Sequence, residues 1–462
     1  MADRRKNTIT ILGAGPAGLA AADECIRRGI KPLVLEREGQ PGGLCATIHH
    51  EGFSYDIGGH RLFTRDQFVE QEVKALLGED LLTVDRKSRI FSRGRYFQYP
   101  LDPVDAFRNL GIVDAGRAGK DYLLAKLDGS PNRSFEDWTK KAFGKYIYDR
   151  FFGEYTRKVW GIPGSKISAD WASQRVRNLN LAKAVLDSLG LIRKPPTSLV
   201  SQFYYARRGF GQIYDNLAAR ITEAGGEIRC DSRVAGFEKD GKRISRIITS
   251  GARDETWEVD KVISTIPLPV LARELVPEVS EQASGLQFRG LITVLLTANR
   301  APLLEDHWLY FPNKDIPFGR LHEPYNWSKD LSPRGHSSLV VEWFASPGDG
   351  LWQEDDGRLI QTTIEVLENQ LKLVSPGSLK GAQVKRWQEA YPVYDLGYQE
   401  KLTPVHEALA GIENLALAGR GGQFRYHNAD HAMLTGYAAV DALLGGASDP
   451  MNVNQDGRYL ES

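Results

Sequence analysis

The chain has 462 residues, and at about 150 residues per domain this length predicts two to three domains with a large buried core. It carries 59 basic and 59 acidic residues, which argues against a general affinity for polyanions, so no nucleic acid is expected as a partner. Its three cysteines have no C-x-x-C spacing and its first strand begins close to the N-terminus, which predicts a cytoplasmic protein without a metal site, signal peptide or membrane span.

The first element is an apolar strand that runs into a glycine motif, Gly13-x-Gly15-x-x-Gly18, and then into an alanine-rich helix. Gly13 permits a tight turn, Gly15 lets the backbone approach a phosphate, and Gly18 lets the helix pack on the strand. Pro16 and Ala17 begin the helix, whose N-terminal N–H groups and positive dipole end attract anions. The motif predicts a dinucleotide pyrophosphate site, with a chance glycine cluster in an ordinary strand-turn-helix unit as the alternative.

A second strand, residues 31–36, ends in Glu36 about 20 residues after the motif, where a carboxylate accepts hydrogen bonds from the adenosine ribose hydroxyls. The loop that follows contains Arg37, Gly43 and Leu44 and resembles the loop of FAD enzymes of the amine oxidase and glutathione reductase superfamily. Its glycines let the loop pass close to the ribityl and phosphate chain. FAD is therefore the expected cofactor, with a simple glycine turn as the alternative.

The later segments predict a discontinuous α/β fold. Residues 100–200 have a mainly helical pattern, strands return between residues 226 and 270 in a block that resembles the β-meander of FAD proteins, and alternating segments follow. We expect a Rossmann-type FAD-binding domain formed by residues 1–98, 205–286 and 411–446, a helical substrate domain at 99–204, a mostly antiparallel sheet domain at 287–410 and a tail at 447–462.

Five segments, taken in order, resemble the UDP-galactopyranose mutase family. They are Tyr55-Asp56-Ile57-Gly58-Gly59-His60, Phe151-Phe152-x-x-Tyr155-Thr156-Arg157-Lys158-Val159-Trp160-Gly161, Phe318-Gly319-Arg320-Leu321-His322-Glu323, Tyr391-Pro392-Val393-Tyr394-Asp395 and Gly419-Arg420-(x5)-Tyr426-x-Asn428-x-Asp430-His431. Their order and spacing carry the resemblance more than any single segment does, and the resemblance covers nearly the whole chain.

The resemblance implies an isomerase of cell-surface glycan biosynthesis that interconverts the pyranose and furanose forms of a nucleotide sugar such as UDP-galactose. In this family reduced FAD is a covalent nucleophile: its N5 attacks the anomeric carbon, UDP leaves, and the opened sugar recloses through a different hydroxyl. No net oxidation occurs, and NAD(P)H is one candidate reductant. A departing diphosphate requires fixed cations and hydroxyl donors around it.

The resemblance also implies roles for individual residues. Arg175 and Arg320 match the family's diphosphate arginines and, with His60, are the expected catalytic residues. The expected substrate contacts further include Tyr99, Phe151, Phe152, Tyr155, Trp160, Tyr310, Tyr391 and Tyr426. The expected flavin contacts are Gly58, Gly59, His60, Gly419, Arg420, Asn428 and Asp430, with Val234 beside the adenine. His60 is expected to act through its backbone carbonyl and not as a general base.

Several alternatives stay open at this point. The aromatic residues between Phe151 and Trp160 have the spacing of a helix core, and an arginine often serves in a surface salt bridge. An oxidase of the amine oxidase or protoporphyrinogen oxidase type would share the glycine motifs, and a non-catalytic FAD-fold binding protein would share the fold. The sequence leaves open the sugar, the base, the reductant and the oligomeric state, and residues 187–201 are expected to form a lid.

Overall fold

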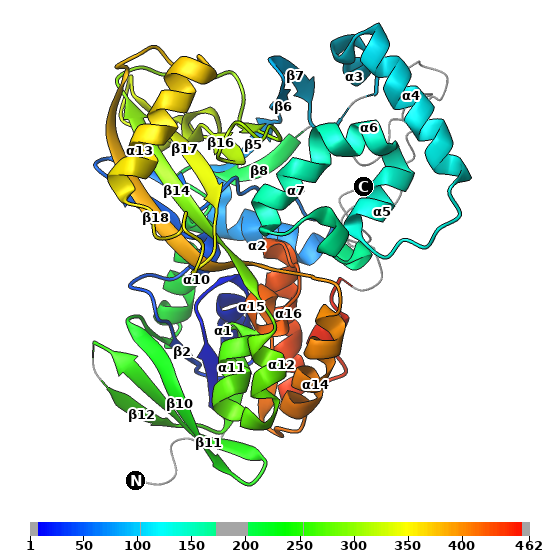
Figure 1. The fold of residues 1–462 in the computed structure, drawn as a ribbon. Helices are drawn as coiled ribbons and strands as arrows, with labels where there is room; N and C mark the ends of the chain where they lie inside the picture. Colours follow the sequence, from blue (N-terminus) through cyan, green and yellow to red (C-terminus); the bar gives the residue numbers. More distant parts are fainter. Residues whose placement is uncertain (1–7, 102, 172–201, 253, 455–462) are drawn as a thin grey trace.

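The computed structural model describes residues 8–101, 103–171, 202–252 and 254–454. Figure 1 shows a parallel sheet with its helices in the lower half, a large sheet at the upper left and a helical arm at the upper right. Arg175, an expected catalytic and substrate-binding residue, lies outside the described residues, as do residues 187–201, the expected lid.

The lower half is built on a five-stranded parallel sheet in the order β19-β13-β1-β2-β9. Its strands are β1 (Ile9–Leu12), β2 (Leu33–Leu35), β9 (Glu227–Arg229), β13 (Lys261–Ser264) and β19 (Leu415–Leu417). These strands come from three separate stretches of chain, which confirms the expected discontinuous Rossmann-type fold. Ile9, Ile11 and Leu12 of β1 are fully buried, as is typical of a parallel strand that is covered on both faces.

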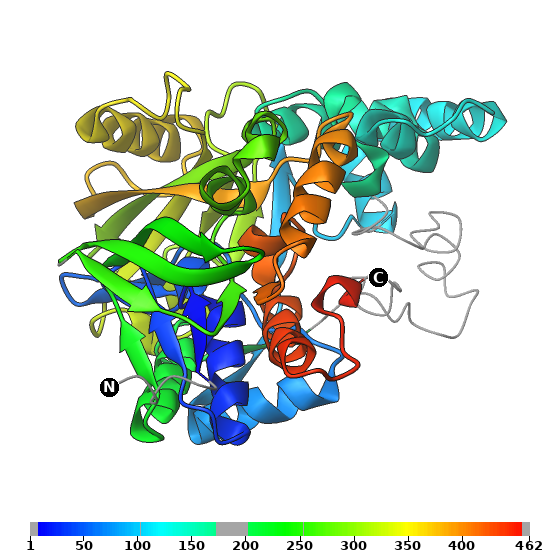
Figure 2. The same cartoon turned by 90° about the horizontal axis from the view of Figure 1, so that it is seen from below.

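Helices and smaller sheets surround this parallel sheet (Figure 2). The helices are α1 (Pro16–Arg27), α2 (Gln67–Leu77), α10 (Gln212–Glu223), α11 (Leu268–Leu275), α12 (Ser280–Ser284), α14 (Tyr398–Ala410), α15 (Gly419–Gln423) and α16 (Ala429–Leu443). The antiparallel strands β10 (Ser232–Asp240), β11 (Arg243–Gly251) and β12 (Glu255–Glu258) form the expected meander. Two further pairs are β3 (Thr47–His50) with β4 (Phe53–Asp56), and β5 (Leu81–Asp85) with β8 (Gln202–Ala206).

The upper sheet has seven strands in the order β18-β14-β17-β16-β15-β6-β7. Its members are β6 (Ser88–Ser92), β7 (Arg95–Gln98), β14 (Phe288–Ala298), β15 (Trp308–Tyr310), β16 (Arg320–His322), β17 (Ser337–Phe344) and β18 (Leu379–Pro392), and α13 (Asp356–Glu365) packs against it. Strands β6 and β7 therefore belong to this sheet and not to the FAD-binding unit, which differs from the expected boundary at residue 98. The reason is a long-range parallel pairing of β6 with β15.

The helical arm lies beside the upper sheet, at the upper right edge of the molecule in Figure 1. It contains α3 (Pro103–Leu110), α4 (Ile112–Leu127), α5 (Phe135–Phe143), α6 (Lys145–Ile147), a π-helical turn at Tyr148–Phe152 and α7 (Gly153–Trp160). A second π-helical turn follows α13 at Val366–Gln370, and 3-10 turns occur at Gly43–Cys45, Gly78–Asp80, Gly164–Lys166, Pro277–Val279, Pro324–Asn326, Lys329–Leu331 and Pro450–Asn452. None of the helices in the described ranges is both long and apolar enough to cross a membrane.

Helices α1 and α16 cross so closely that one glycine has no room for a side chain. A Cβ atom at Gly436 would lie 2.1 Å from the carbonyl oxygen of Ala17 and 3.0 Å from the backbone nitrogen of Ala21. Both neighbours are backbone atoms, so no rotamer change relieves the clash. The crossing holds the middle of α16 against α1, the helix that follows the first two glycines of the motif.

We predict that Gly436→Ala destabilises the protein by about 1–3 kcal/mol because it overpacks this crossing. The measurement is urea denaturation followed by far-UV circular dichroism, and the expected result is a lower midpoint. Gly350→Ala is the control, since a Cβ there meets no atom within 4 Å, and its effect is expected within about 0.5 kcal/mol. Equal midpoints for the two variants would contradict the prediction.

Candidate functional site

A cavity of about 700 Å³ lies where the carboxyl ends of the parallel strands meet the upper sheet and the start of α16. This edge of a parallel sheet is where ligands of doubly wound proteins bind. The cavity is lined by almost all of the expected cofactor contacts, namely Gly13, Gly15, Pro16, Ala17, Glu36, Arg37, Gly43, Leu44, Gly58, Gly59, His60, Val234, Gly419, Arg420, Asn428 and Asp430. It is also lined by Tyr99, Tyr310, Arg320, Tyr391 and Tyr426 from the expected substrate contacts.

One end of the cavity is the glycine turn between β1 and α1. Gly13 has a φ of +99°, and Gly15 is the N-cap of α1 without a side chain to satisfy the first N–H groups. Gly18 does not line the cavity but lies beneath the turn, where a Cβ would come within 1.9 Å of the carbonyl oxygen of Gly13. A Cβ at Gly43 would lie 3.1 Å from the Cα of Gly15. The glycine loops at Gly13–Gly15 and at Gly43 and the N-terminus of α1 thus face the same part of the cavity. This arrangement is suited to binding a pyrophosphate.

Glu36 follows β2 and is 6% exposed at the cavity wall. The backbone N–H of Ala14 donates to its Oε2 at 2.6 Å, and that of Glu38 donates to its Oε1 at 2.9 Å. Burial raises the pKa of Glu36, and these two backbone donors oppose that effect. A carboxylate has about four acceptor positions, so two remain for ribose hydroxyls. Arg37 beside it is half exposed and forms ion pairs with Glu38 and Glu389.

His60 lies further along the cavity, after the Gly58–Gly59 pair. Gly58 has a φ of +134°, a backbone conformation that favours glycine. The imidazole of His60 stacks on Phe210 with ring centres 5.4 Å apart. Burial and the positive charge of Arg420 lower the pKa of His60 to about 3. A neutral imidazole of such low basicity is poorly suited to general-base catalysis at neutral pH, which agrees with a role through position.

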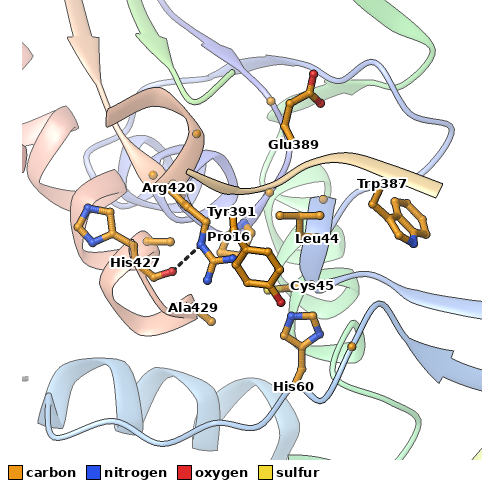
Figure 3. Close-up of a pocket in the computed structure, with 18 of the residues that line it drawn as sticks. Pro16, Leu44, Cys45, His60, Trp387, Glu389, Tyr391, Arg420, His427 and Ala429 are labelled. Atoms are coloured by element: carbon orange, nitrogen blue, oxygen red, sulfur yellow. Dashed lines mark hydrogen bonds between the residues drawn. The ribbon is translucent and has the colours of Figure 1, made fainter. Parts of the chain in front are cut away.

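Arg420 is held at the opposite wall by backbone oxygens (Figure 3). Its Nε donates to the carbonyl of His427 at 2.8 Å, and another guanidinium nitrogen donates to that of Ala390 at 3.0 Å. The guanidinium carbon lies 5.4 Å from the ring centre of Tyr391 and 4.9 Å from that of Tyr426. Asn428 and Asp430, at the N-terminus of α16, also line the cavity. These groups form a polar edge that is suited to a flavin ring system.

Arg320, on β16, lies in the part of the cavity wall that the upper sheet forms. Its guanidinium lies 2.5 Å from the carboxylate of Glu342 and donates to the hydroxyl of Tyr391 at 2.9 Å. Burial opposes its charge, but Glu342 and Tyr391 outweigh that effect and keep the pKa of Arg320 well above its ordinary value. Burial also opposes ionisation of Glu342, yet Arg320 and His322 hold its pKa below the ordinary range. Arg320 therefore presents a permanent positive charge to the cavity.

Tyrosine side chains surround this arginine. The rings of Tyr99 and Tyr310 lie 4.4 Å apart, and Tyr155 meets Tyr310 edge to face at 5.9 Å. On the other side, Tyr391 stacks on Tyr426 at 5.9 Å. Of these tyrosines, Tyr391 bonds Arg320 through its hydroxyl and Tyr310 lies directly opposite Arg320 in the sheet.

The structure does not bring every expected aromatic residue to the cavity wall. Phe151 is 4% exposed and packs against Phe97 of β7 in the upper sheet, and Phe152 stacks on Phe143 of α5 at 5.6 Å. Both side chains pack on other aromatic rings and neither lines the cavity, so the expected uridine contacts of these two residues find no support in the cavity lining. Trp160 is buried behind the cavity wall, where its ring centre lies 6.2 Å from that of Tyr391.

Sequence reasoning missed a lysine that connects the arm to the substrate wall. The Nζ of Lys158, on α7, donates to the carbonyl oxygens of Phe311, Asn313 and Phe318 at 2.8, 2.5 and 3.3 Å. These carbonyls belong to the loop between Tyr310 and Arg320, and burial lowers the pKa of Lys158 to about 8. Lysine is rarely buried, so only its place within the family-like 151–161 segment could have marked it.

Glu342 was missed as well, although a signal was available. It is the one charged residue in the apolar run Ser338-Leu339-Val340-Val341-Glu342-Trp343, and it is almost fully buried. A charge buried in such a strand requires a partner. Its partner is Arg320.

Several known proteins resemble the chain. The solved structure of reduced UDP-galactopyranose mutase matches it with a TM-score of 0.86 and 26% identity, over 98% of each chain. A putative protoporphyrinogen oxidase from Exiguobacterium has the same fold, with a TM-score of 0.73 and 19% identity over 95% of this chain and 98% of that chain. These matches confirm the fold and the resemblance to the mutases that the sequence motifs indicate.

Two relatives found by sequence bear the names of oxidases, and others are named ferredoxin–NADP reductase and phytoene desaturase. Coproporphyrinogen III oxidase of Bacillus subtilis is 20% identical over 89% of this chain and 92% of its own length. Protoporphyrinogen oxidase 2 of Arabidopsis thaliana is 22% identical over 88% of this chain and 87% of its own length. A model described as flavin containing amine oxidoreductase matches residues 16–444, nearly the whole chain, and the chain therefore belongs to this flavin-dependent enzyme family.

Proposed function

We propose that the protein is an FAD-dependent nucleotide-sugar mutase that interconverts the pyranose and furanose forms of a sugar such as UDP-galactose. The observation that carries this proposal is the charged guanidinium of Arg320, which pairs with Glu342 and donates to the hydroxyl of Tyr391, at the wall of the cavity whose other end fits FAD. Such a wall suits a diphosphate. The high structural similarity to a UDP-galactopyranose mutase supports the same activity.

The residues of the chain have separable tasks in this proposal. FAD, when bound and reduced, supplies a nucleophilic nitrogen for the anomeric carbon of the sugar. Arg320 and the hydroxyl of Tyr391 bind the diphosphate and stabilise the negative charge that develops as it leaves. His60, with its pKa near 3, stays neutral and has no role as a general base in this proposal. Arg175, the second expected diphosphate ligand, remains a proposal from the sequence.

An oxidase is the second candidate, because two of the relatives found by sequence carry oxidase names. An amine oxidase has no evident use for a buried arginine set among tyrosines, whereas a porphyrinogen carries carboxylates that an arginine also binds. The two functions differ in what they do with electrons. A mutase leaves its substrate at the same oxidation level, and an oxidase passes electrons to an acceptor.

The first prediction concerns the redox dependence of activity. We expect the FAD-loaded protein, reduced with dithionite under anaerobic conditions, to convert UDP-galactofuranose to UDP-galactopyranose, and the oxidised protein to be inactive. Chromatography of the nucleotide sugars measures the conversion. Turnover of a porphyrinogen or amine that releases hydrogen peroxide, without any mutase activity in the reduced state, would show that the chain is an oxidase.

The second prediction concerns the diphosphate contact. We expect Arg320→Ala to weaken binding of UDP by about 30-fold, or about 2 kcal/mol, because a charged hydrogen-bonding partner is lost. Isothermal titration calorimetry measures the affinity, and the flavin content per chain reports on folding. Arg334→Ala, an exposed arginine outside the cavity, is the matched control and is expected to bind UDP normally. Unchanged binding by Arg320→Ala would refute the assignment.

The third prediction concerns Lys158 as a positioning residue. We expect Lys158→Met to lower kcat/KM about tenfold, because the loop that precedes Arg320 loses its three hydrogen bonds and shifts. Lys158→Arg keeps a donor and is expected to recover part of the loss. Lys314→Met is the control, since this lysine is exposed on the same loop. Equal kcat/KM values for Lys158→Met and Lys314→Met would contradict the role.

A further inference from the structure

A buried histidine lies behind the arginine of the proposed diphosphate wall. His322 is two residues after Arg320 on β16, so both side chains lie on the same face of the strand. It is 1% exposed and does not line the cavity, so contact with a bound ligand is not its role. Neither of its ring nitrogens has a hydrogen-bond partner of ordinary length among the described residues. A buried imidazole in such a place is costly compared with an apolar side chain, which points to a role other than packing.

The imidazole lies beside the carboxylate of Glu342 on β17. The Nδ1 of His322 is 3.5 Å from Oε1 of Glu342, and Oε2 of the same carboxylate pairs with the guanidinium of Arg320 at 2.5 Å. The two oxygens of one carboxylate thus face two side chains of the neighbouring strand. A carboxylate accepts hydrogen bonds and cannot donate them, so Nδ1 must carry a proton for its contact with Glu342 to be attractive.

A tryptophan fixes the orientation of the imidazole. The ring of His322 stacks on Trp327 with ring centres 5.3 Å apart and an angle of 15° between the planes. The indole is 3% exposed and packs edge to face on Trp308 and Tyr205, at 5.7 and 5.1 Å. This stack restricts rotation of the imidazole, and Nδ1 therefore stays directed at Glu342.

The same two neighbours of His322 lie under the Gly58–Gly59 pair. A Cβ at Gly58 would come within 3.6 Å of Oε2 of Glu342, and a Cβ at Gly59 would come within 3.5 Å of the indole of Trp327. Both glycines line the cavity. The layer formed by Glu342, His322 and Trp327 therefore supports this stretch of backbone as well as the arginine.

We propose that His322 is a positioning residue of the diphosphate wall, whose Nδ1–H holds the carboxylate of Glu342 in the orientation that pairs with Arg320. This role rests on the proposed function, because Arg320 is the contact of the ligand there. A carboxylate held at one oxygen can rotate, whereas one held at both oxygens presents a fixed charge to the guanidinium. The guanidinium is then ordered before the ligand arrives, which lowers the entropic cost of binding.

The first test compares UDP binding by variants of the FAD-loaded protein, measured by calorimetry. Leu and Asn have similar branched shapes, but Asn keeps an N–H donor near the position of Nδ1. We expect His322→Leu to weaken UDP binding about fivefold, as the loss of one hydrogen bond does, and to leave uridine binding unchanged. His322→Asn is expected to recover most of the loss. His49→Leu, at an exposed histidine outside the cavity, is the matched control and is expected to bind UDP normally.

The outcomes distinguish failure of this role from failure of the proposed function. A parent protein that does not bind UDP would refute the diphosphate wall itself. A parent that binds UDP, with His322→Leu equally tight or with His322→Asn as weak as His322→Leu, would refute only the positioning role. An equal loss of UDP and uridine binding by His322→Leu would indicate general damage to the cavity and would also reject the role.

The second test locates the proton on the ring and does not depend on UDP. Nitrogen-15 NMR of the FAD-loaded protein, labelled at its nine histidines, distinguishes a protonated ring nitrogen from a bare one. The signal that is absent from His322→Asn or His322→Leu belongs to His322. We expect this ring to carry a proton on Nδ1, with or without a second one on Nε2. A bare Nδ1 with the proton on Nε2 would overturn the proposal.

Discussion

The candidate site depends on one ion pair inside the upper sheet. Arg320 on β16 lies directly opposite Glu342 on β17, and Tyr310 on β15 lies directly opposite Arg320. The sheet register thus sets a phenol, a guanidinium and a carboxylate in one row, because residues directly paired across neighbouring strands share a face of the sheet. Glu342 stabilises a buried cation that would otherwise be costly, and the rigid strands hold that cation at the cavity wall.

The fold places this row opposite the cofactor end of the cavity. Gly13 and Glu36 line the cavity at the carboxyl ends of the parallel strands β1 and β2. Arg320 and Tyr391 line it from strands β16 and β18 of the upper sheet. Arg420 lines the same cavity, held by carbonyl oxygens of His427 and Ala390 (Figure 3). The phosphates of a dinucleotide and the diphosphate of a second nucleotide can then be bound by different walls of one cavity.

The sequence predicts best those features that consecutive residues determine. The turn at Gly13 to Gly18 and the carboxylate of Glu36 require a local backbone geometry, so their spacing alone identified them. The roles of Phe151 and Phe152 could not be predicted in the same way. Which side of a helix faces a cavity depends on how the arm docks, and a π-helical turn at Tyr148–Phe152 changes the phase of the side chains. Lys158 was missed because its partners lie about 150 residues later in the chain.

The central claim is that the wall around Arg320 binds the diphosphate of a nucleotide beside a flavin. The most direct measurement is a pair of calorimetric titrations of the FAD-loaded, reduced protein, one with UDP and one with uridine. Because the diphosphate supplies the charge that Arg320 binds, the account predicts that UDP binds at least about tenfold more tightly than uridine, and that added salt reduces the difference. Equal affinities for UDP and uridine, or no binding of either, would contradict it.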